Sequence, residues 1–360
     1  MSFSSQSIKP SVSTHNAKGI FQYPSAFFHN NNTKATLRPS DLIACTDKTR
    51  NNSYLELSYS ITSTTIFISL LLLGSTMAST SRHPHVILAT RIHLGKQATP
   101  PELSVLIRNL STFLRTASSI NASKAVIAVD PEETIEGYDL VASIEQALND
   151  AKRAEPSFQQ QHYEIIKVSP WGNFVPALNA LTSWACIHQI EYGNTAIMFI
   201  SAETSVTQET VEAMSCHMAD DTLVVGAALP GHDYRGTETN NAIEVDLNGR
   251  TCPWNTIAMW NLNKLALLGF PLVADGLHRL DDGTPIAAGI EEVATVLMHQ
   301  KLNPTGSKAK LVKVNGVEWR QNFEDEERMK WHDAKMKSKY ARAELHRSLL
   351  GGLEGKVLHF

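Results

Sequence analysis

Carboxylate side chains stand at places in this sequence where they could take part in chemistry. Glu203 follows the apolar run 195–200 in the turn Ser201-Ala-Glu203, and Glu291 and Glu292 open a segment with helical periodicity. A carboxylate at the end of a strand can bind Mg²⁺ or Mn²⁺. A carboxylate in the first turn of a helix is kept ionised by the helix dipole and can act as a general base. The pattern therefore indicates a site that combines a bound cation with a base.

Alternating apolar strands and amphipathic helices would position these side chains. Strands are predicted over residues 85–92, 125–129, 163–168, 195–200 and 223–229, and helices over 100–117, 138–153, 176–189 and 207–218. Near-continuous apolar strands that alternate with helices predict an α/β fold, a mainly parallel sheet with helices on both faces. Because parallel strands end at one edge of a sheet, Asp130, Ser201 and Glu203 are expected at the same edge.

The pattern changes after Pro230. Asn248-Gly249 predicts a hairpin through 244–250, and 257–268 is expected to be either a helix or a strand followed by a helix. A helix is expected over 289–300 and a strand over 310–317. The segment 324–347 carries charges throughout, which favours a solvated surface helix.

Several signatures of α/β enzymes are absent. The sequence has no GxGxxG after its first strand, no GxxxxGK[ST] and no GxSxG, which argues against dinucleotide, P-loop and hydrolase sites. The net charge is −4, and the sequence shows no cluster of basic residues of the kind that binds nucleic acid. No nucleic-acid partner is therefore expected. Its 4 cysteines are widely spaced and are expected to be lone buried thiols.

Five segments, spread over about residues 84–320, resemble family-2-like glycosyltransferases of the GT-A fold in order and spacing. They are Ala128-Val-Asp130, Gly172-Asn-Phe-Val-Pro-Ala-Leu-Asn-Ala-Leu181, Phe199-Ile-Ser-Ala-Glu-Thr204, Trp260-Asn-Leu-Asn-Lys-Leu-Ala-Leu-Leu-Gly-Phe-Pro271 and Gly289-Ile-Glu-Glu292. The resemblance implies an enzyme that moves a sugar from a nucleotide-sugar donor to an acceptor hydroxyl. The implied donor-site residues are Asp130 for the nucleoside, with Trp171, Asn179 and Ser201 lining the pocket.

The resemblance also implies a metal ligand and a base. Glu203 would be a single carboxylate ligand for Mn²⁺ or Mg²⁺, and Glu292 or Glu291 would accept the proton of the acceptor hydroxyl. The sequence departs from the family at two of these points. Ser201 stands where the first Asp of the Asp-x-Asp metal motif is expected, and Glu292 replaces the usual Asp, which moves the base by about an ångström. The Gln-x-x-Arg-Trp element of processive synthases is absent, which disfavours a synthase.

Other interpretations remain open at each residue. Asp130 can be the cap of a turn before Pro131, Glu203 a solvated loop residue, and Glu291 and Glu292 ordinary first-turn acids. The alternative function is a catalytically inactive GT-A-like protein that binds nucleotides or acts as a scaffold. A third interpretation is an unrelated α/β domain.

The N-terminal part differs in composition from the rest. Residues 1–56 are rich in Ser, Asn and Thr and are predicted to be disordered, and 57–81 carry no charge and form a candidate transmembrane or targeting segment. The GT-A-like domain is predicted over 84–320 and a charged helical tail over 321–360. A real anchor at 57–81 would associate the protein with a membrane and make it single-pass endomembrane. Without the anchor, a cytoplasmic protein is expected.

Overall fold

The computed structural model describes residues 83–93, 100–132, 134–135, 138–154, 158, 162–190, 193–237, 241–276, 279, 283, 289–319 and 326–360. These residues belong to one compact unit, Ser79–Phe360. The segments predicted as disordered, 1–56, and as a candidate transmembrane or targeting segment, 57–81, lie outside the described residues. Within the described ranges, no helix has the length and apolar character needed to cross a bilayer.

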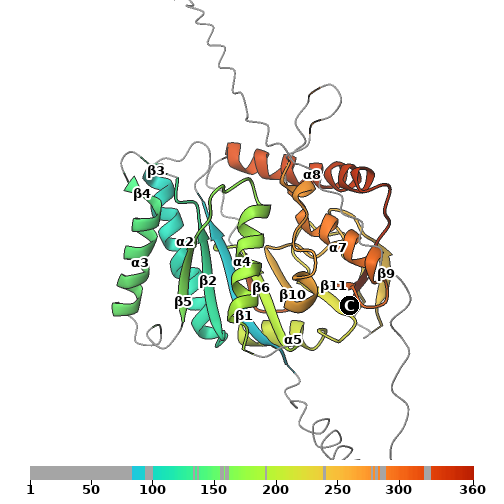
Figure 1. The fold of residues 1–360 in the computed structure, drawn as a ribbon, viewed down its shortest axis with the longest axis horizontal. Helices are drawn as coiled ribbons and strands as arrows, with labels where there is room; N and C mark the ends of the chain where they lie inside the picture. Colours follow the sequence, from blue (N-terminus) through green and yellow to red (C-terminus); the bar gives the residue numbers. More distant parts are fainter. Residues whose placement is uncertain are drawn as a thin grey trace, which may run out of the picture. The chain divides into compact units, whose positions relative to one another are not determined.

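A mixed sheet forms the centre of this unit, and its described strands run in the order β5-β2-β1-β6-β10-β8-β11-β13-β9 (Figure 1). Of these, β10 is antiparallel to both of its neighbours and β9 is antiparallel to β13, whereas the other pairs are parallel. The mainly parallel α/β fold expected from the sequence is thus confirmed. The strand bounds are β1 His85–Ile92, β2 Lys124–Val129, β5 Tyr163–Lys167, β6 Thr195–Ile200, β8 Thr222–Ala227, β9 Ile243–Asp246, β10 Ile257–Asn261, β11 Lys308–Val312 and β13 Lys356–His359.

Helices connect and cover these strands. Their bounds are α2 Pro100–Ser119, α3 Leu140–Ala154, α4 Val175–His188, α5 Gln208–Ser215, α6 Leu262–Leu265, α7 Glu291–Leu302 and α8 Glu326–Leu349, with a 3₁₀ turn η2 at Leu272–Asp275. Short strands β3 Thr134–Ile135, β4 Tyr138–Asp139, β7 Thr204–Val206 and β12 Val317–Trp319 form two small ribbons. Because β6 and β8 are buried along their whole length, both of their faces are covered.

The order of the strands reverses between β1 and β6. From β1 the chain passes to β2 and then β5 on one side, and it returns to β6 on the other side. Right-handed crossovers that run in opposite directions place α2 and α3 on one face of the sheet and α4 on the other. In an open α/β sheet, ligands bind beyond the carboxyl ends of the strands at such a switch point. The fold therefore directs attention to the ends of β1 and β6.

The C-terminal third differs from the sequence-based expectation in two ways. The prediction of a hairpin through 244–250 is wrong, because β9 pairs with the distant strand β13. The turn itself forms, since Asn248 Oδ1 accepts hydrogen bonds from the backbone N–H groups of Arg250 and Thr251. Helix α8 is not solvated all round, because Lys339 and His346 are buried on its inner side.

Candidate functional site

Arg91 lies near the carboxyl end of β1, at the switch point of the sheet. Ala89 of β1 pairs with Phe199 of β6, so Arg91 comes opposite Ser201 two residues further on. Its guanidinium stacks over the ring of Phe174 at 4.2 Å from the centroid, and Nη1 donates a hydrogen bond to the Asn173 carbonyl oxygen at 3.2 Å. These contacts hold a cation, which is half-buried, at the edge of the sheet.

Four carboxylates act on the charge of Arg91. Burial lowers the pKa of the guanidinium, and the negative charges of Glu291, Glu292, Asp275 and Glu203 act in the opposite direction. Three of the residues predicted for the site, Glu203, Glu291 and Glu292, are thus among the groups whose charge acts on Arg91. In the described part of the chain, the ion pairs join other groups, and Arg91 takes part in none.

An unusual backbone conformation introduces the carboxylate pair. Gly289 has φ 113° and Ile290 has φ 55°, so both residues immediately before α7 are left-handed. A β-branched residue in this region costs on the order of 1–3 kcal/mol, and such strain clusters at functional sites. Glu291 and Glu292 follow in the first turn and are 4% and 5% exposed. The local backbone therefore places two buried carboxylates side by side.

Asn255 holds both members of this pair. Its backbone N–H donates to Glu292 Oε1 at 2.5 Å, and its Nδ2 donates to Glu291 Oε1 at 3.3 Å. Trp260 Nε1 donates to Asn255 Oδ1 at 2.9 Å and so fixes the orientation of the amide. Burial, together with the neighbouring Glu291, raises the pKa of Glu292 to about 7, and Lys339 opposes this rise. A carboxylate with a pKa near neutrality suits general acid–base catalysis.

Basic residues of α8 face the start of α7. Lys339 Nζ lies 3.5 Å from the centroid of the Trp254 ring, and its charge favours the ionised form of Glu292. His346 is fully buried; burial lowers its pKa, and the charge of Glu291 partly opposes this. The helix expected to be a solvated element is therefore part of the electrostatic surroundings of the carboxylate pair.

Asp275 serves the start of α4. Its Oδ1 accepts hydrogen bonds from the backbone N–H groups of Phe174 at 2.6 Å and Val175 at 2.9 Å, and both oxygens lie 3.1 Å from the Asn173 backbone nitrogen. Gly172 has φ 65°, and a Cβ there would lie 2.5 Å from Asp275 Oδ2, so this turn requires glycine. The Asp275 carboxylate thus fixes the loop on which Arg91 rests.

Three of the residues predicted for the donor site have identified neighbours. Asp130 lies at the end of β2 and accepts a hydrogen bond from the Glu132 backbone N–H at 2.9 Å. Trp171 is buried in the loop before α4, with its ring 6.0 Å from that of His93. Asn179 is bonded through its amide to the backbone N–H and carbonyl of Phe270. The structure gives Asn179 a structural contact that clamps α4 to the Gly-Phe-Pro segment.

The residues at the predicted metal position do not form a ligand set for a divalent cation. Ser201 and Glu203 supply one hydroxyl and one carboxylate, and the charge of Glu203 acts on the Arg91 guanidinium. No group of three or more His, Cys, Asp or Glu side chains in the described residues is arranged to hold a metal ion. Mg²⁺ and Mn²⁺ need an oxygen-rich site, and a neighbouring arginine cation disfavours them. The donor set therefore does not fit the Mn²⁺ or Mg²⁺ expected from the sequence.

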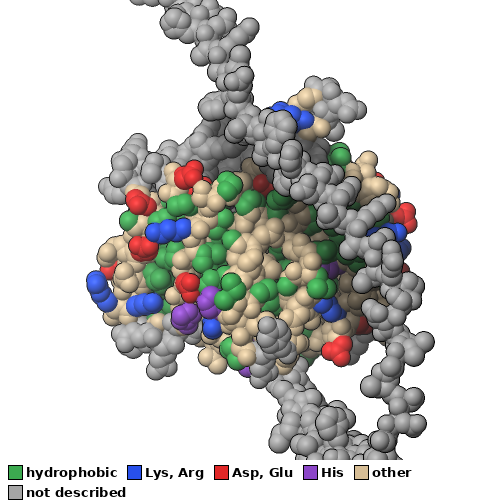
Figure 2. Space-filling view, viewed as in Figure 1, with side chains coloured by type: hydrophobic (Ala, Val, Ile, Leu, Met, Phe, Trp, Pro, Cys, Tyr) green, Lys and Arg blue, Asp and Glu red, His purple; other side chains and the backbone are tan. Residues whose placement is uncertain are grey.

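A groove on the α4 face lacks the groups that catalysis would need. It is lined by residues of α4 and of the turn after α6, including Cys186, Ile187 and Leu267. Ile187 and Leu267 are 79% and 77% exposed. Figure 2 shows that apolar and uncharged side chains predominate on this face. The lining has no carboxylate, lysine, arginine or histidine, and burial raises the pKa of the Cys186 thiol, so the groove lacks a group suited to acid–base catalysis near neutral pH.

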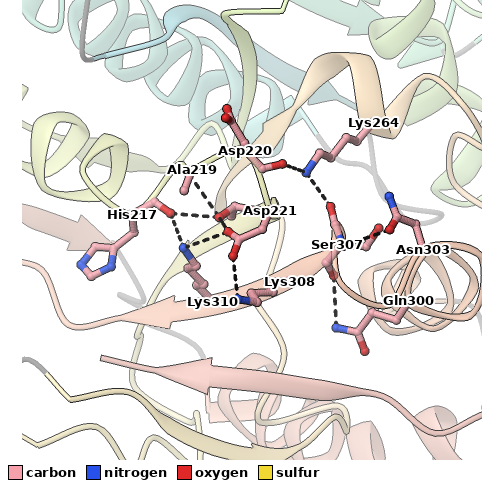
Figure 3. Close-up of polar contacts among 12 residues, drawn as sticks. His217, Ala219, Asp220, Asp221, Lys264, Gln300, Asn303, Ser307, Lys308 and Lys310 are labelled. Carbon is pink, nitrogen blue, oxygen red and sulfur yellow. Dashed lines mark hydrogen bonds and ion pairs between the residues drawn. The ribbon is translucent and has the colours of Figure 1, made fainter.

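A second group of charges lies near the amino ends of β8 and β11, at the edge of the sheet opposite Arg91. We call this group the lysine cluster: Lys264, Lys308 and Lys310 with Asp221 (Figure 3). Every ammonium group in the cluster is bonded to protein oxygen. The bonds run from Lys264 Nζ to the carbonyls of Asp220 and Gly306, from Lys308 Nζ to Asp221 Oδ2 at 2.6 Å, and from Lys310 Nζ to the His217 carbonyl at 2.7 Å. The lysine side chains of the cluster thus join the segments around residues 217–221 and 306.

Sequence reasoning missed Arg91, Asp275 and Asn255. Arg91 had a visible signal, because it is a charged residue near the end of an otherwise apolar strand. Asp275 and Asn255 had none, since their partners lie 100 and 37 residues away in the chain.

Comparisons with known proteins give distant structural neighbours. No protein-family model and no curated protein sequence matches the chain. Among solved structures, a 4-diphosphocytidyl-2C-methyl-D-erythritol synthase is 13% identical at a TM-score of 0.35, covering 70% of this chain and 98% of that one. GalNAc-T7 with UDP, GalNAc and Mn²⁺ is 9% identical at 0.37, covering 62% and 42%. A UDP-glucose pyrophosphorylase complexed with UDP-glucose is 10% identical at 0.32, covering 51% and 79%. This likeness is too distant to transfer a ligand or an activity to the chain.

Proposed function

We propose that the chain is a glycosyltransferase that moves a sugar from a nucleotide-sugar donor to an acceptor hydroxyl. The observation that carries the proposal is the position of Glu292. It is a buried carboxylate with a pKa of about 7, held at the start of a helix, and its charge acts on Arg91 at the switch point of the sheet. A base near neutrality and a cation at a ligand-binding edge are the two requirements of this reaction.

The reaction assigns separate tasks to the residues of this edge. The acceptor oxygen forms a bond to the sugar carbon, and the bond from that carbon to the donor diphosphate oxygen breaks. The acceptor proton passes to the Glu292 carboxylate, while the bonding electrons leave with the diphosphate. Asn255 orients Glu292 through the bond to Oε1. Asp130, at the end of β2, is the proposed contact of the nucleoside, and Trp171 and Ser201 are proposed to line the donor pocket.

The test measures donor cleavage by the full-length protein. A panel of nucleotide sugars is incubated with water and with a mixture of simple sugars as acceptors, and the release of nucleoside diphosphate is followed. We expect release from one donor class, and a loss of about 100-fold in Glu292→Gln because a general base contributes 10²–10⁴-fold. Glu209→Gln is the matched control, since Glu209 is also a first-turn acid but lies exposed on α5.

Two results would contradict the proposal. Equal rates of nucleoside diphosphate release by the wild type and Glu292→Gln would show that Glu292 is not the general base. Nucleotide binding without any release of nucleoside diphosphate would favour the alternative of an inactive nucleotide-binding protein.

A further inference from the structure

The disagreement between the expected metal motif and the residues present points to a different source of positive charge. Ser201 replaces the first carboxylate of the motif, and the parallel β1–β6 register, continued two residues beyond the Ala89–Phe199 pair, brings Arg91 level with it. The negative charge of Glu203 acts on Arg91. The resident cation of this position is therefore a guanidinium.

The contacts of Arg91 leave most of its hydrogen-bonding capacity unused. A guanidinium has five N–H donors in a planar fork. Within the described residues, one of them is bonded to the Asn173 carbonyl oxygen, and the stacking on Phe174 uses the face of the group rather than its N–H edge. Its other N–H groups, which form no hydrogen bond within the described residues, are of the kind that recognises phosphate or carboxylate.

Three of the four carboxylates whose charge acts on Arg91 accept hydrogen bonds from other donors. Asp275 accepts the backbone N–H groups at the start of α4, which also uses up the anion-binding capacity of that helix terminus. Glu291 and Glu292 accept from Asn255. Their charges lie near Arg91, but their hydrogen bonds point elsewhere. The guanidinium thus forms no direct ion pair within the described residues, although the four carboxylate charges act on it.

We propose that Arg91 binds the diphosphate of the donor in place of a divalent metal ion. This inference rests on the proposed function and specifies how the same site recognises its substrate. A guanidinium is permanently charged and can bond two phosphate oxygens in parallel, and it stabilises the negative charge that develops on the leaving diphosphate. The ligand class is therefore a nucleoside diphosphate or its sugar ester, bound without a metal.

The test is isothermal titration of the full-length protein with UDP, GDP, CDP and ADP, in EDTA and in Mn²⁺. We expect at least one of these nucleotides to bind with a dissociation constant that differs by less than about threefold between the two buffers. Arg91→Gln should weaken binding by about 30-fold or more, because a charge-assisted bond to phosphate is lost. Arg115→Gln is the control, since Arg115 is an exposed arginine on α2. Thermal unfolding of each variant checks that the fold is kept.

The variant Ser201→Asp provides an independent test of the same proposal, because it keeps Arg91. The new carboxylate should pair with Arg91 and weaken binding in EDTA. It should also complete a carboxylate pair with Glu203, so that Mn²⁺ restores part of the affinity. Binding that requires Mn²⁺ in the wild type and is unchanged in Arg91→Gln would overturn this inference alone. Absence of binding for every nucleotide in both buffers would overturn the proposed function, and this inference with it.

Discussion

The two edges of the sheet handle charge differently. In the lysine cluster at the amino edge, every ammonium group is bonded to a carbonyl or carboxylate oxygen of the protein. At the carboxyl edge, Arg91 has one hydrogen bond and a stacked ring, and the pKa of Glu292 is raised to about 7. Charged groups whose hydrogen bonds are all made within the protein fix the positions of loops, whereas charged groups with unused donors are available to a ligand. The number of hydrogen bonds made within the protein, rather than the number of charged residues, therefore distinguishes a structural cluster from a candidate site.

The carboxyl edge also contains a strained backbone position and a buried support. The left-handed Ile290 introduces the carboxylate pair at the carboxyl edge. Asp275 supports that edge from beneath by fixing the loop under Arg91. The candidate site thus combines rigid supports with groups whose charge is only partly satisfied, as preorganised sites require.

The largest expected effect comes from removing the support of the carboxyl edge. Asp275→Ala leaves backbone N–H groups at the start of α4 without their acceptor. We expect it to lower the free energy of unfolding by about 3 kcal/mol, as for other buried, charged hydrogen-bond partners. Urea unfolding measures the change. Asp275→Asn keeps one acceptor oxygen and should lose less, and equal stability of the alanine variant and the wild type would contradict the assigned role.

The effect of Glu292→Gln on the free energy of unfolding should depend on pH. The folded-state pKa of about 7 lies above the ordinary value of 4.5, so folding favours the protonated form. The stability that this proton supplies is present below pH 4.5 and is lost as the pH rises through 7. The free energy of unfolding of Glu292→Gln should therefore rise relative to that of the wild type between pH 5 and 8, by on the order of 2 kcal/mol. Urea unfolding across this pH range tests the prediction, and parallel pH profiles for the two proteins would contradict it.

The lysine cluster should respond more weakly and in the opposite pH direction. The hydrogen bond from Lys308 lowers the pKa of Asp221, so its contribution is present above the ordinary carboxyl pKa and is lost as the pH falls below it. Because the Asp221 side chain is 39% exposed, we expect Asp221→Asn to cost only about 1 kcal/mol at pH 7. The cost should vanish in acid. Unfolding at pH 7 and pH 3 measures both values, and nucleotide binding should stay unchanged.

The smallest effect concerns the influence of α8 on the carboxylate pair. Lys339 favours the ionised form of Glu292. Lys339→Met keeps the packing of the aliphatic chain on Trp254 and removes the charge, so the pKa of Glu292 should rise by about half a unit. Carboxyl ¹³C chemical shifts followed by NMR against pH report this value. A pKa of Glu292 that falls in the variant would show that the lysine acts in another way.

The sequence was sufficient to predict the strands and helices that carry the site, because continuously apolar strands alternate with helices along it. The expected strand 85–92 is β1, and Thr207 caps α5 in the capping box with Thr210.

What the sequence did not predict depends on contacts between distant segments. The turn chemistry of Asn248-Gly249 was right, but the partner strand lies beyond residue 355, so local signals could not identify it. Arg91 was assigned only to a strand, because its role depends on Phe174 and on the carboxylates of later segments. The many charges of α8 concealed its buried face, since long basic side chains can cover apolar and acidic neighbours.

A crystal structure of the protein with the nucleoside diphosphate that binds most tightly in solution would test most directly whether Arg91 binds the donor diphosphate. We expect density for the diphosphate against the guanidinium of Arg91, between the ends of β1 and β6, with Glu292 facing the space beyond it. A nucleotide bound at the lysine cluster, or a diphosphate at the carboxyl edge held by a metal ion without contact to Arg91, would contradict this expectation.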